Sequence, residues 1–217
     1  HLMKDMHHTP GGIFKVGGSD KPDEYPTVEP EGIFSLPHEQ EHQGRIALIG
    51  HSAGGWISRV YLSSRNYAGK AYHGSRFVHS LVTLGSPHRN GIGPAFEALE
   101  WVNRRPDESK HVRTLAVGSK GFRGTEWGGL TRGSYAFCCP DGSDGSSFDG
   151  DGMTPVQCAL GLAHAEHLLL EHTHHFPWSD VFGGNIVSPE LAKDHKEGNP
   201  WYGSETVIDK WVDFLQQ

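Results

Sequence analysis

The chain has little of what nucleic-acid-binding, membrane-spanning or disulfide-stabilised proteins require. It carries 19 Lys and Arg against 26 Asp and Glu, a net charge of −7, without a basic stripe, so nucleic acid is not an expected partner. No apolar run reaches the ~18 residues of a transmembrane helix. The 3 cysteines form no disulfide framework, because Cys138 and Cys139 are adjacent and Cys158 has the character of a small core residue. We expect all three to be reduced.

Hydrophobic residues are also scarce, at 35%, whereas glycine is abundant, with 29 residues, so long loops are expected. The 217 residues fit one ordinary domain. Residues 1–44 are rich in Gly, Pro, His and acidic side chains and are predicted to be an irregular N-terminal region. Residues 45–217 are predicted to form the folded core. The first residue is His1 and no signal peptide is visible, so the sequence indicates no compartment.

Strand and helix patterns alternate along residues 45–217, which predicts an α/β fold with a mostly parallel sheet and helices on both faces. Residue 118, a glycine, is expected to close the third strand, and Thr154 and Pro155 are expected to cap and open a helix. A Gly-, Ser- and Asp-rich excursion is expected over 118–150. The predicted strands are 45–49, 77–84, 112–117 and 167–170; the predicted helices are 53–63, 94–103, 155–163 and 205–215.

The most informative motif follows the first predicted strand. Gly50-His51-Ser52-Ala53-Gly54 is a G-x-S-x-G sequence between a strand and a helix, the context of a nucleophile elbow. Ser52 would occupy a strained turn that exposes its hydroxyl, and a side chain at Gly50 or Gly54 would collide with neighbouring backbone. The N–H of Ala53, at the helix start, is then expected to stabilise an oxyanion.

Sites in open parallel sheets lie beyond the carboxyl ends of the strands. The predicted strand exits bear Ser52, then residues 85–88, then the segment containing Asp151, then the histidines of 171–175. Ser, Asp and His in this chain order are typical of an α/β-hydrolase triad. Asp151 directly precedes a predicted helix start that would hold it still, whereas its rivals are expected to be turn residues in a solvated loop. Those rivals are Asp141, Asp144 and Asp149.

Several segments together resemble the plant and algal lipase-like branch of the α/β-hydrolase superfamily. They are the elbow, Leu81 to His88, Gly150-Asp151-Gly152-Met153-Thr154-Pro155, the His175 region and Pro200-Trp-Tyr-Gly203. The resemblance implies ester hydrolysis through Ser52, Asp151 and His175 without a cofactor. It includes members predicted to be in plastids and is therefore compatible with a chloroplast location.

Of the 16 histidines, the family pattern places the base at His175, just before Phe176-Pro177, with His174 as the alternative. His51 is expected to pack beside the nucleophile and His88 to be a pocket-wall or surface residue. His164 and His167 invite a metal interpretation, but they straddle a predicted change from helix to strand, so no metal site is expected.

One departure from the family pattern concerns the N-terminal region. Members usually carry three or four strands before the elbow, and a loop after one of them supplies the second oxyanion donor. Only 44 residues precede the strand here, so we expect either a missing N-terminal part or a partner chain that covers the sheet edge. Gly11-Gly12 and Gly17-Gly18 are alternative sources of the second donor.

Three functional interpretations follow. The first is a serine esterase or lipase acting on an ester or lipid substrate. The second is a weakly active or inactive hydrolase-fold subunit of a larger assembly, and the third is metal binding or storage through the histidines. Five aromatic residues are candidates for lining an acyl pocket: Trp101, Trp127, Phe137, Trp178 and Phe182.

Overall fold

The computed structural model describes residues 44–105, 109–125, 128–139, 142–177 and 200–216. Apart from Gly44, the predicted irregular region 1–44, including both Gly-Gly pairs, lies outside the described residues. Trp127, Asp141, Trp178 and Phe182 lie outside them as well.

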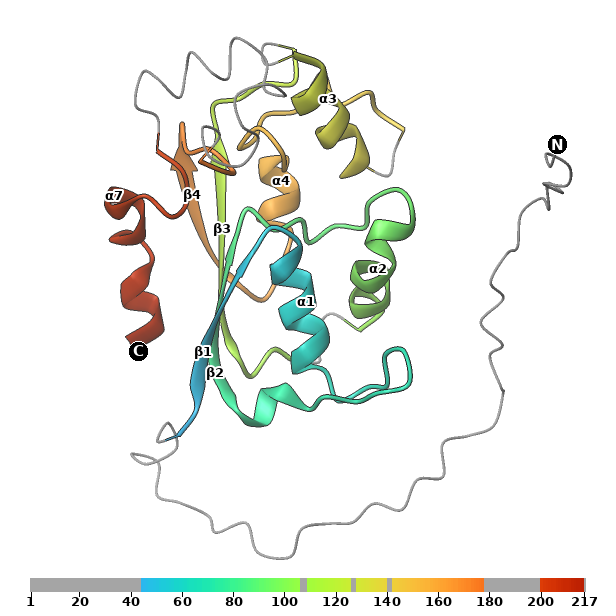
Figure 1. The fold of residues 1–217 in the computed structure, drawn as a ribbon, viewed down its shortest axis with the longest axis vertical. Helices are drawn as coiled ribbons and strands as arrows, with labels where there is room; N and C mark the ends of the chain where they lie inside the picture. Colours follow the sequence, from blue (N-terminus) through green and yellow to red (C-terminus); the bar gives the residue numbers. More distant parts are fainter. Residues whose placement is uncertain (1–43, 106–108, 126–127, 140–141, 178–199, 217) are drawn as a thin grey trace, which may run out of the picture. The chain divides into compact units, whose positions relative to one another are not determined.

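A four-stranded parallel sheet forms the centre of the fold, with the strands in sequential order β1-β2-β3-β4 (Figure 1). In the register, Gly50 pairs with Thr83 and Thr83 with Ala116, so three of the strands end near one another. The predicted α/β class and the four predicted strands are therefore confirmed. The strands are β1 (Ile46–His51), β2 (Val78–Leu84), β3 (Arg113–Lys120) and β4 (Glu166–Glu171).

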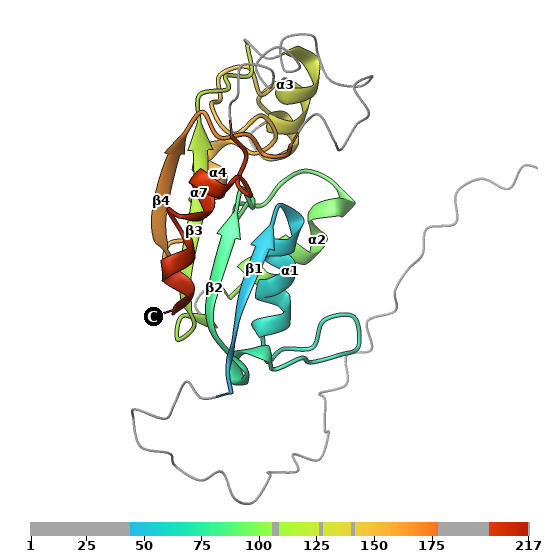
Figure 2. The same cartoon turned by 60° about the vertical axis from the view of Figure 1, so that its left-hand side comes forward.

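Helices cover both faces of the sheet (Figures 1 and 2). One face carries α1 (Ala53–Leu62), the 3-10 turn η3 (Pro94–Phe96), α2 (Glu97–Asn103) and α4 (Val156–Ala159), while α3 (Gly128–Phe137) lies beyond the strand ends. The other face carries α7 (Glu205–Ile208) and the 3-10 helix η5 (Val212–Gln216). A short 3-10 turn, η2 (Gly74–Arg76), precedes β2.

The two faces have separate apolar cores, because successive side chains on a strand point to opposite faces. On the α7 face, Val82 and Val117 pack with Val207, Trp211 and Phe214. On the α1 face, helix residues dominate the core. They are Trp56, Val60, Phe96, Leu99, Val102, Cys138 and Cys158.

β1 is the outermost strand of the described sheet on its side, pairing only with β2 among the described residues. Ile46 and Ile49 are each 51% exposed. Apolar side chains therefore reach the surface along this edge, as expected for a strand with one described neighbour.

The prediction that Gly118 closes the third strand is wrong. β3 continues through Gly118 to Lys120. A Cβ atom at Gly118 would lie 3.0 Å from the Ala159 Cβ and 3.1 Å from the Leu160 Cγ. The glycine therefore permits α4 to approach the strand closely, which is a packing role.

The Gly-, Ser- and Asp-rich excursion expected over 118–150, in which no helix was predicted, contains α3. Its Tyr135 is fully buried, donates a hydrogen bond to Phe122 O at 2.7 Å and accepts one from Gly152 N at 2.9 Å. Three glycines in α3 conceal its helical character in the sequence, since glycine has a low helix propensity. Tertiary contacts of Tyr135 outweigh that propensity.

Two predicted helices are shorter than expected. The helix predicted over 155–163 is limited to α4, and Pro155 rather than Thr154 stands at its N-cap, without a side-chain capping bond. The helix predicted over 205–215 divides into α7 and η5. At this division the Trp211 indole donates a hydrogen bond to Tyr202 O at 3.3 Å, which holds the segment against the sheet.

The glycines around Ser52 differ in how much space surrounds them. A Cβ atom at Gly50 would lie 2.7 Å from backbone atoms of Gly54 and Gly55, as predicted. At Gly54 nothing lies within 4 Å, so the predicted collision there is wrong. Gly55 is the second tight position, because a Cβ atom would collide with the side chain of Ser86.

We predict that Gly55→Ala lowers the free energy of unfolding by about 1–3 kcal/mol, the usual range for overpacking. Gly54→Ala is the matched control on the same helix and is expected to be neutral or stabilising by ~0.5–1 kcal/mol. Urea unfolding of both variants provides the measurement. Equal stability of the two variants would contradict the close contact between α1 and the turn after β2.

Candidate active site

Ser52 stands in the turn between β1 and α1 with φ 55° and ψ −127°, a backbone conformation that non-glycine residues rarely adopt. Its N–H donates to Leu84 O at 3.0 Å, and its carbonyl accepts from Gly55 N at 3.1 Å. These bonds tie the turn to the end of β2 and to the first turn of α1. The strain predicted for an elbow is therefore present at Ser52.

Ala53 is the first residue of α1, a helix of 10 residues. Its N–H belongs to the first turn, whose N–H groups have no partner within the helix. Among the described residues this N–H takes part in no hydrogen bond. It is thus free for an acceptor that approaches the turn, as the sequence predicts for an oxyanion donor.

Asp151 and His175, which follow β3 and β4, form a buried pair. His175 Nδ1 lies 2.7 Å from Asp151 Oδ2, and His175 N donates to Asp151 O at 2.9 Å. The side chains are 0% and 1% exposed for Asp151 and His175 respectively. A carboxylate in this position fixes the ring so that Nδ1 carries the proton and Nε2 is the accepting nitrogen.

The other oxygen of Asp151 is held by backbone. Oδ1 accepts hydrogen bonds from Met153 N at 2.9 Å and from Thr154 N at 2.7 Å. Thr154, predicted to be a helix cap, therefore contributes its N–H to the acid. This Asx-type turn holds the carboxylate still just before α4.

Sequence reasoning missed Tyr202. Its hydroxyl donates to Asp151 Oδ2 at 3.0 Å, and the side chain is fully buried. Burial, followed by the nearby charge of Asp151, raises the pKa of Tyr202 well above its ordinary value. The segment Pro200-Trp-Tyr-Gly203 was distinctive only as part of a family resemblance. No local pattern indicates that a residue 51 positions away in sequence contacts the acid.

His51 lies beside the base. Its ring centroid is 4.7 Å from that of His175, and its Nε2 lies 2.9 Å from His175 O, where an Nε2–H donates. Burial, and then the charge of His175, lower the pKa of His51, so it is neutral at pH 7. The residue before Ser52 therefore connects the elbow to the backbone of His175.

The structure thus brings Asp151 into contact with His175. Ser52 directly follows His51, which itself contacts His175. Among the described residues, no hydrogen bond joins the Ser52 hydroxyl to His175. Hydrogen bonds between a nucleophile and its base are often long in ligand-free proteins and shorten when substrate binds. The ring of the alternative base, His174, is stacked on that of Phe122 with the centroids 4.2 Å apart, whereas the ring bonded to Asp151 Oδ2 is that of His175.

His88, predicted to be a pocket-wall or surface residue, is buried beneath α1, so a surface position is wrong. Its Nε2 lies 2.9 Å from Thr83 Oγ1, and its Nδ1 lies 3.5 Å from a guanidinium nitrogen of Arg59. Arg59 is itself buried, which lowers its pKa to about 10, and it donates to Asn103 Oδ1 at 2.8 Å. Burial lowers the pKa of His88 well below its ordinary value, so neutral His88 serves to connect α1 to the end of β2.

The rival acids have structural contacts. Asp144 is exposed and accepts from Ser146 N at 2.9 Å, which is the predicted turn role. Asp149 accepts from Gly121 N at 2.7 Å and so anchors the end of β3. Neither carboxylate contacts His175, whose Nδ1 is bonded to Asp151.

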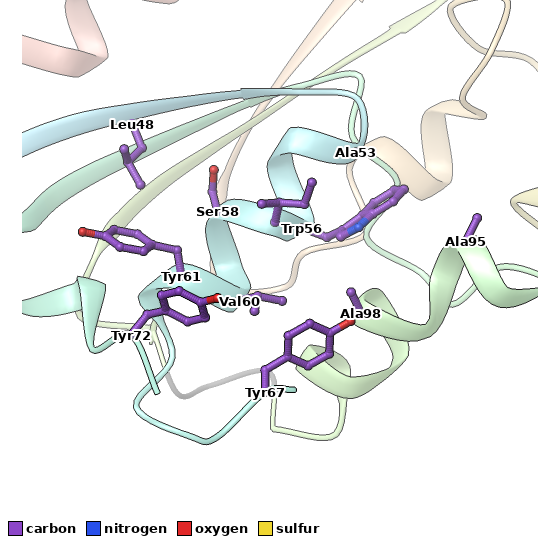
Figure 3. Close-up of a pocket in the computed structure, with 11 residues that line it drawn as sticks. Leu48, Ala53, Trp56, Ser58, Val60, Tyr61, Tyr67, Tyr72, Ala95 and Ala98 are labelled. Carbon is purple, nitrogen blue, oxygen red and sulfur yellow. The ribbon is translucent and has the colours of Figure 1, made fainter. Parts of the chain in front are cut away.

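An apolar groove of about 650 Å³ runs beside α1 (Figure 3). Its lining residues come from several elements, among them Leu48 of β1, Ala53 and Trp56 of α1 and Ala95 of η3. Neither described member of the predicted aromatic set lines it: Trp101 packs at 5.1 Å on Tyr67, and Phe137 is 61% exposed. The lining consists of Leu48, Ala53, Trp56, Ile57, Ser58, Val60, Tyr61, Tyr67, Tyr72, Ala95 and Ala98.

Two further properties concern only the described residues. In those ranges no group of three or more His, Cys, Asp and Glu side chains is arranged to hold a metal ion. His167, one of the candidate ligands, has its Nε2 3.0 Å from Leu162 O. None of the helices there combines the length and apolar character that a membrane span requires.

One region of the chain matches a known protein family. Residues 31–97, about a third of the chain, match the family model described as a PGAP1-like alpha/beta domain. The match includes β1, the elbow, α1 and β2. Together with the parallel sheet it supports an α/β fold consistent with an α/β-hydrolase, whereas the plant and algal branch stays a prediction. No curated protein matches the chain.

We predict that Gly85→Ala disrupts the contact between Asp151 and His175. Gly85 has φ 56°, and a Cβ atom there would lie 2.5 Å from Asp151 Oδ2 and 2.9 Å from His175 Nδ1. Strain and overpacking together should lower the free energy of unfolding by about 3 kcal/mol. The downfield NMR signal of the His175 Nδ1 proton should weaken or disappear.

Gly69→Ala is the control, because Gly69 has φ 87° but nothing lies within 4 Å of an added Cβ atom. It should show the backbone strain alone, about 1–2 kcal/mol, with an unchanged His175 signal. If Gly85→Ala keeps the parental signal, the turn after β2 does not restrict the pair.

Proposed function

We propose that this protein is a serine hydrolase that cleaves carboxylic esters, with Ser52 as nucleophile, His175 as base and Asp151 as the acid that orients it. The observation that carries the proposal is the buried Asp151–His175 pair, 2.7 Å apart, beside a strained serine turn. All three residues follow parallel strands of one sheet, as in the chain order typical of hydrolase triads.

In the proposed reaction, His175 Nε2 takes the proton of Ser52 as Oγ forms a bond to the ester carbonyl carbon. The carbonyl oxygen becomes an oxyanion, to which the Ala53 N–H donates. Collapse of this intermediate breaks the bond to the alcohol oxygen, which leaves with the proton from His175. Water then attacks the acyl-enzyme in the same way and releases the carboxylic acid and free Ser52.

The carboxylate of Asp151 stabilises the imidazolium form of His175. Its two backbone donors at Oδ1 fix the carboxylate, so that Oδ2 is directed at His175 Nδ1. Folding thus supplies the free energy that orients the His175 ring. The ring is already oriented before substrate binds.

The groove beside α1 supports an ester with an apolar acyl group. Its volume of about 650 Å³ lies within the ~300–1,000 Å³ range of small-molecule sites, and its lining is largely aliphatic and aromatic. Ala53, the proposed oxyanion donor, also lines the groove (Figure 3). An acyl chain that begins at this donor would therefore have apolar surface available along α1.

The second candidate is a weakly active or inactive subunit of a larger assembly. Two observations among the described residues favour it: the Ser52 hydroxyl has no hydrogen bond to His175, and β1 exposes apolar side chains along the edge that pairs with no second described strand. A fluorophosphonate probe separates the two candidates, because only an activated serine is labelled. A protein that co-purifies in fixed ratio and is not labelled would favour the subunit.

We predict that Ser52→Ala abolishes both hydrolysis of p-nitrophenyl butyrate and fluorophosphonate labelling, with the melting temperature unchanged. Ser63→Ala, directly after α1, is the control; Ser63 Oγ accepts from Arg65 N at 3.0 Å and does not line the groove, so its loss should leave activity near the parental value. A Ser52→Ala variant that retains more than a few per cent of activity would remove Ser52 from the proposed role.

We predict that His175→Ala reduces kcat nearly as far as Ser52→Ala, because triad members act as a unit. His174→Ala should have a much smaller effect.

Asp151→Asn should lower kcat by ~10³–10⁴-fold, since the His175 ring would favour the wrong tautomer. Parental activity should fall as the solution becomes acidic, because a protonated imidazole cannot accept the Ser52 proton.

Asp144→Asn and Asp149→Asn are the matched controls for the acid, and kcat/KM across pH 5–9 is the measurement. Near-parental activity of Asp151→Asn together with a collapse in either control would move the acid to the loop 142–149. If His174→Ala were the inactive variant, the base would be one residue earlier than proposed.

A further inference from the structure

Oδ2 of Asp151, the oxygen that faces His175, accepts hydrogen bonds from two chemically different groups, an imidazole and a phenol. Oδ2 accepts from His175 Nδ1 at 2.7 Å and from the Tyr202 hydroxyl at 3.0 Å. Oδ1 is already occupied by the backbone N–H groups of Met153 and Thr154. The tyrosine is therefore not needed to fix the carboxylate, and its bond is made to the same oxygen that holds the imidazole.

Two hydrogen bonds fix the chain segment that carries Tyr202. Trp211 Nε1 donates to its carbonyl at 3.3 Å, and the preceding Pro200 accepts from His174 N at 2.7 Å. The side chain is 0% exposed, so it does not contact substrate from solvent. Its pKa is raised well above the ordinary value, first by burial and then by the charge of Asp151, so the hydroxyl remains a donor over the working pH range.

We infer that Tyr202 is a positioning residue that sets how strongly Asp151 holds the protonated form of His175. A donor on Oδ2 draws negative charge away from the bond to Nδ1, because hydrogen bonds to one charged oxygen compete. With Tyr202 in place, the imidazolium is stabilised less than it would be by Asp151 alone. The base then remains unprotonated, and able to accept the Ser52 proton, at lower pH. This inference rests on the proposed function of the pair.

Among the described residues, the His175 ring also contacts the rings of His51, at the end of β1, and Tyr202. The Nε2–H of His51 donates to His175 O, and the pKa of His51 is lowered, so it is neutral at pH 7. Asp151, after β3, is therefore the charged group bonded to His175, and Tyr202, before α7, acts on it. Tyr135, from α3, contacts the acid loop at Gly152 N without touching the carboxylate.

The test compares Tyr202→Phe with Tyr135→Phe. Both tyrosines are fully buried and each gives a hydroxyl to the acid region, but only Tyr202 donates to Asp151. In Tyr202→Phe, the acid limb of the kcat/KM profile should move to higher pH by on the order of one unit, the value of a lost hydrogen bond to a charged group. KM should stay unchanged. Tyr135→Phe should lower the melting temperature without moving the limb.

A second measurement does not require activity. In a Ser52→Ala background, the pH midpoint of the His175 ring signals in ¹H–¹⁵N NMR should rise in Tyr202→Phe by the same amount. If no ester is hydrolysed but this midpoint moves, the proposed function fails, whereas the effect of Tyr202 on the Asp151–His175 bond is upheld. If ester hydrolysis is present and neither limb nor midpoint moves, the inference fails alone.

A third variant tests the inference even if Tyr202→Phe does not fold. Site-specific replacement of Tyr202 by 3-fluorotyrosine keeps the packing and makes the hydroxyl a stronger donor. The limb and the NMR midpoint should then move in the opposite direction, to lower pH. Shifts of the same sign with phenylalanine and fluorotyrosine, or a shift in Tyr135→Phe as large as that in Tyr202→Phe, would overturn the positioning role.

Discussion

The burial of one carboxylate governs the rest of the site. Asp151 is 0% exposed, and an ionised group removed from water is tolerated only where hydrogen bonds replace its hydration. Four donors surround it: two backbone N–H groups of its own turn, one imidazole and one phenol. These donors come from three separate segments of the chain. Satisfying Asp151 therefore specifies where those segments must lie.

The turn after β2 shows how closely the segments are packed. Gly85 lies where any side chain would meet Asp151, Tyr202 and His175 at once, and the neighbouring Ser86 fills the space left by Gly55 of α1. Ser86 also donates to Gly50 O at 3.2 Å. The elbow and the buried pair are thus positioned by the same turn, which contributes no group to the proposed chemistry. The backbone strain at Ser52 is offset by this surrounding packing.

Sequence reasoning succeeded where a local pattern carries the information. The four strands, α1 and the strained turn at Ser52 were predictable, because alternation and a glycine-flanked serine are local signals. His175, which is bonded to Asp151, was preferred over His174 through the family resemblance. Sequence reasoning failed where tertiary contacts outweigh local preference. The glycines of α3 hide a helix held by Tyr135, and Gly118 resembles a strand end but serves close packing. The contact between Tyr202 and Asp151 was not predictable from a local pattern, since the two residues are 51 positions apart in the sequence.

The sequential order of the strands has a consequence for how the protein is made. Each strand pairs with the one synthesised just before it, so the sheet can grow one unit at a time from β1 to β4. Tyr202 follows all four strands, and α7 and η5 cover the second face last. A nascent chain that ends after β4 would have the serine turn and the acid, but it would lack α7 and η5, the described cover of the second face, and the Tyr202 donor to Oδ2. Completion of the site therefore coincides with closure of the second core, and a ribosome-bound intermediate is both incomplete in chemistry and exposed to aggregation.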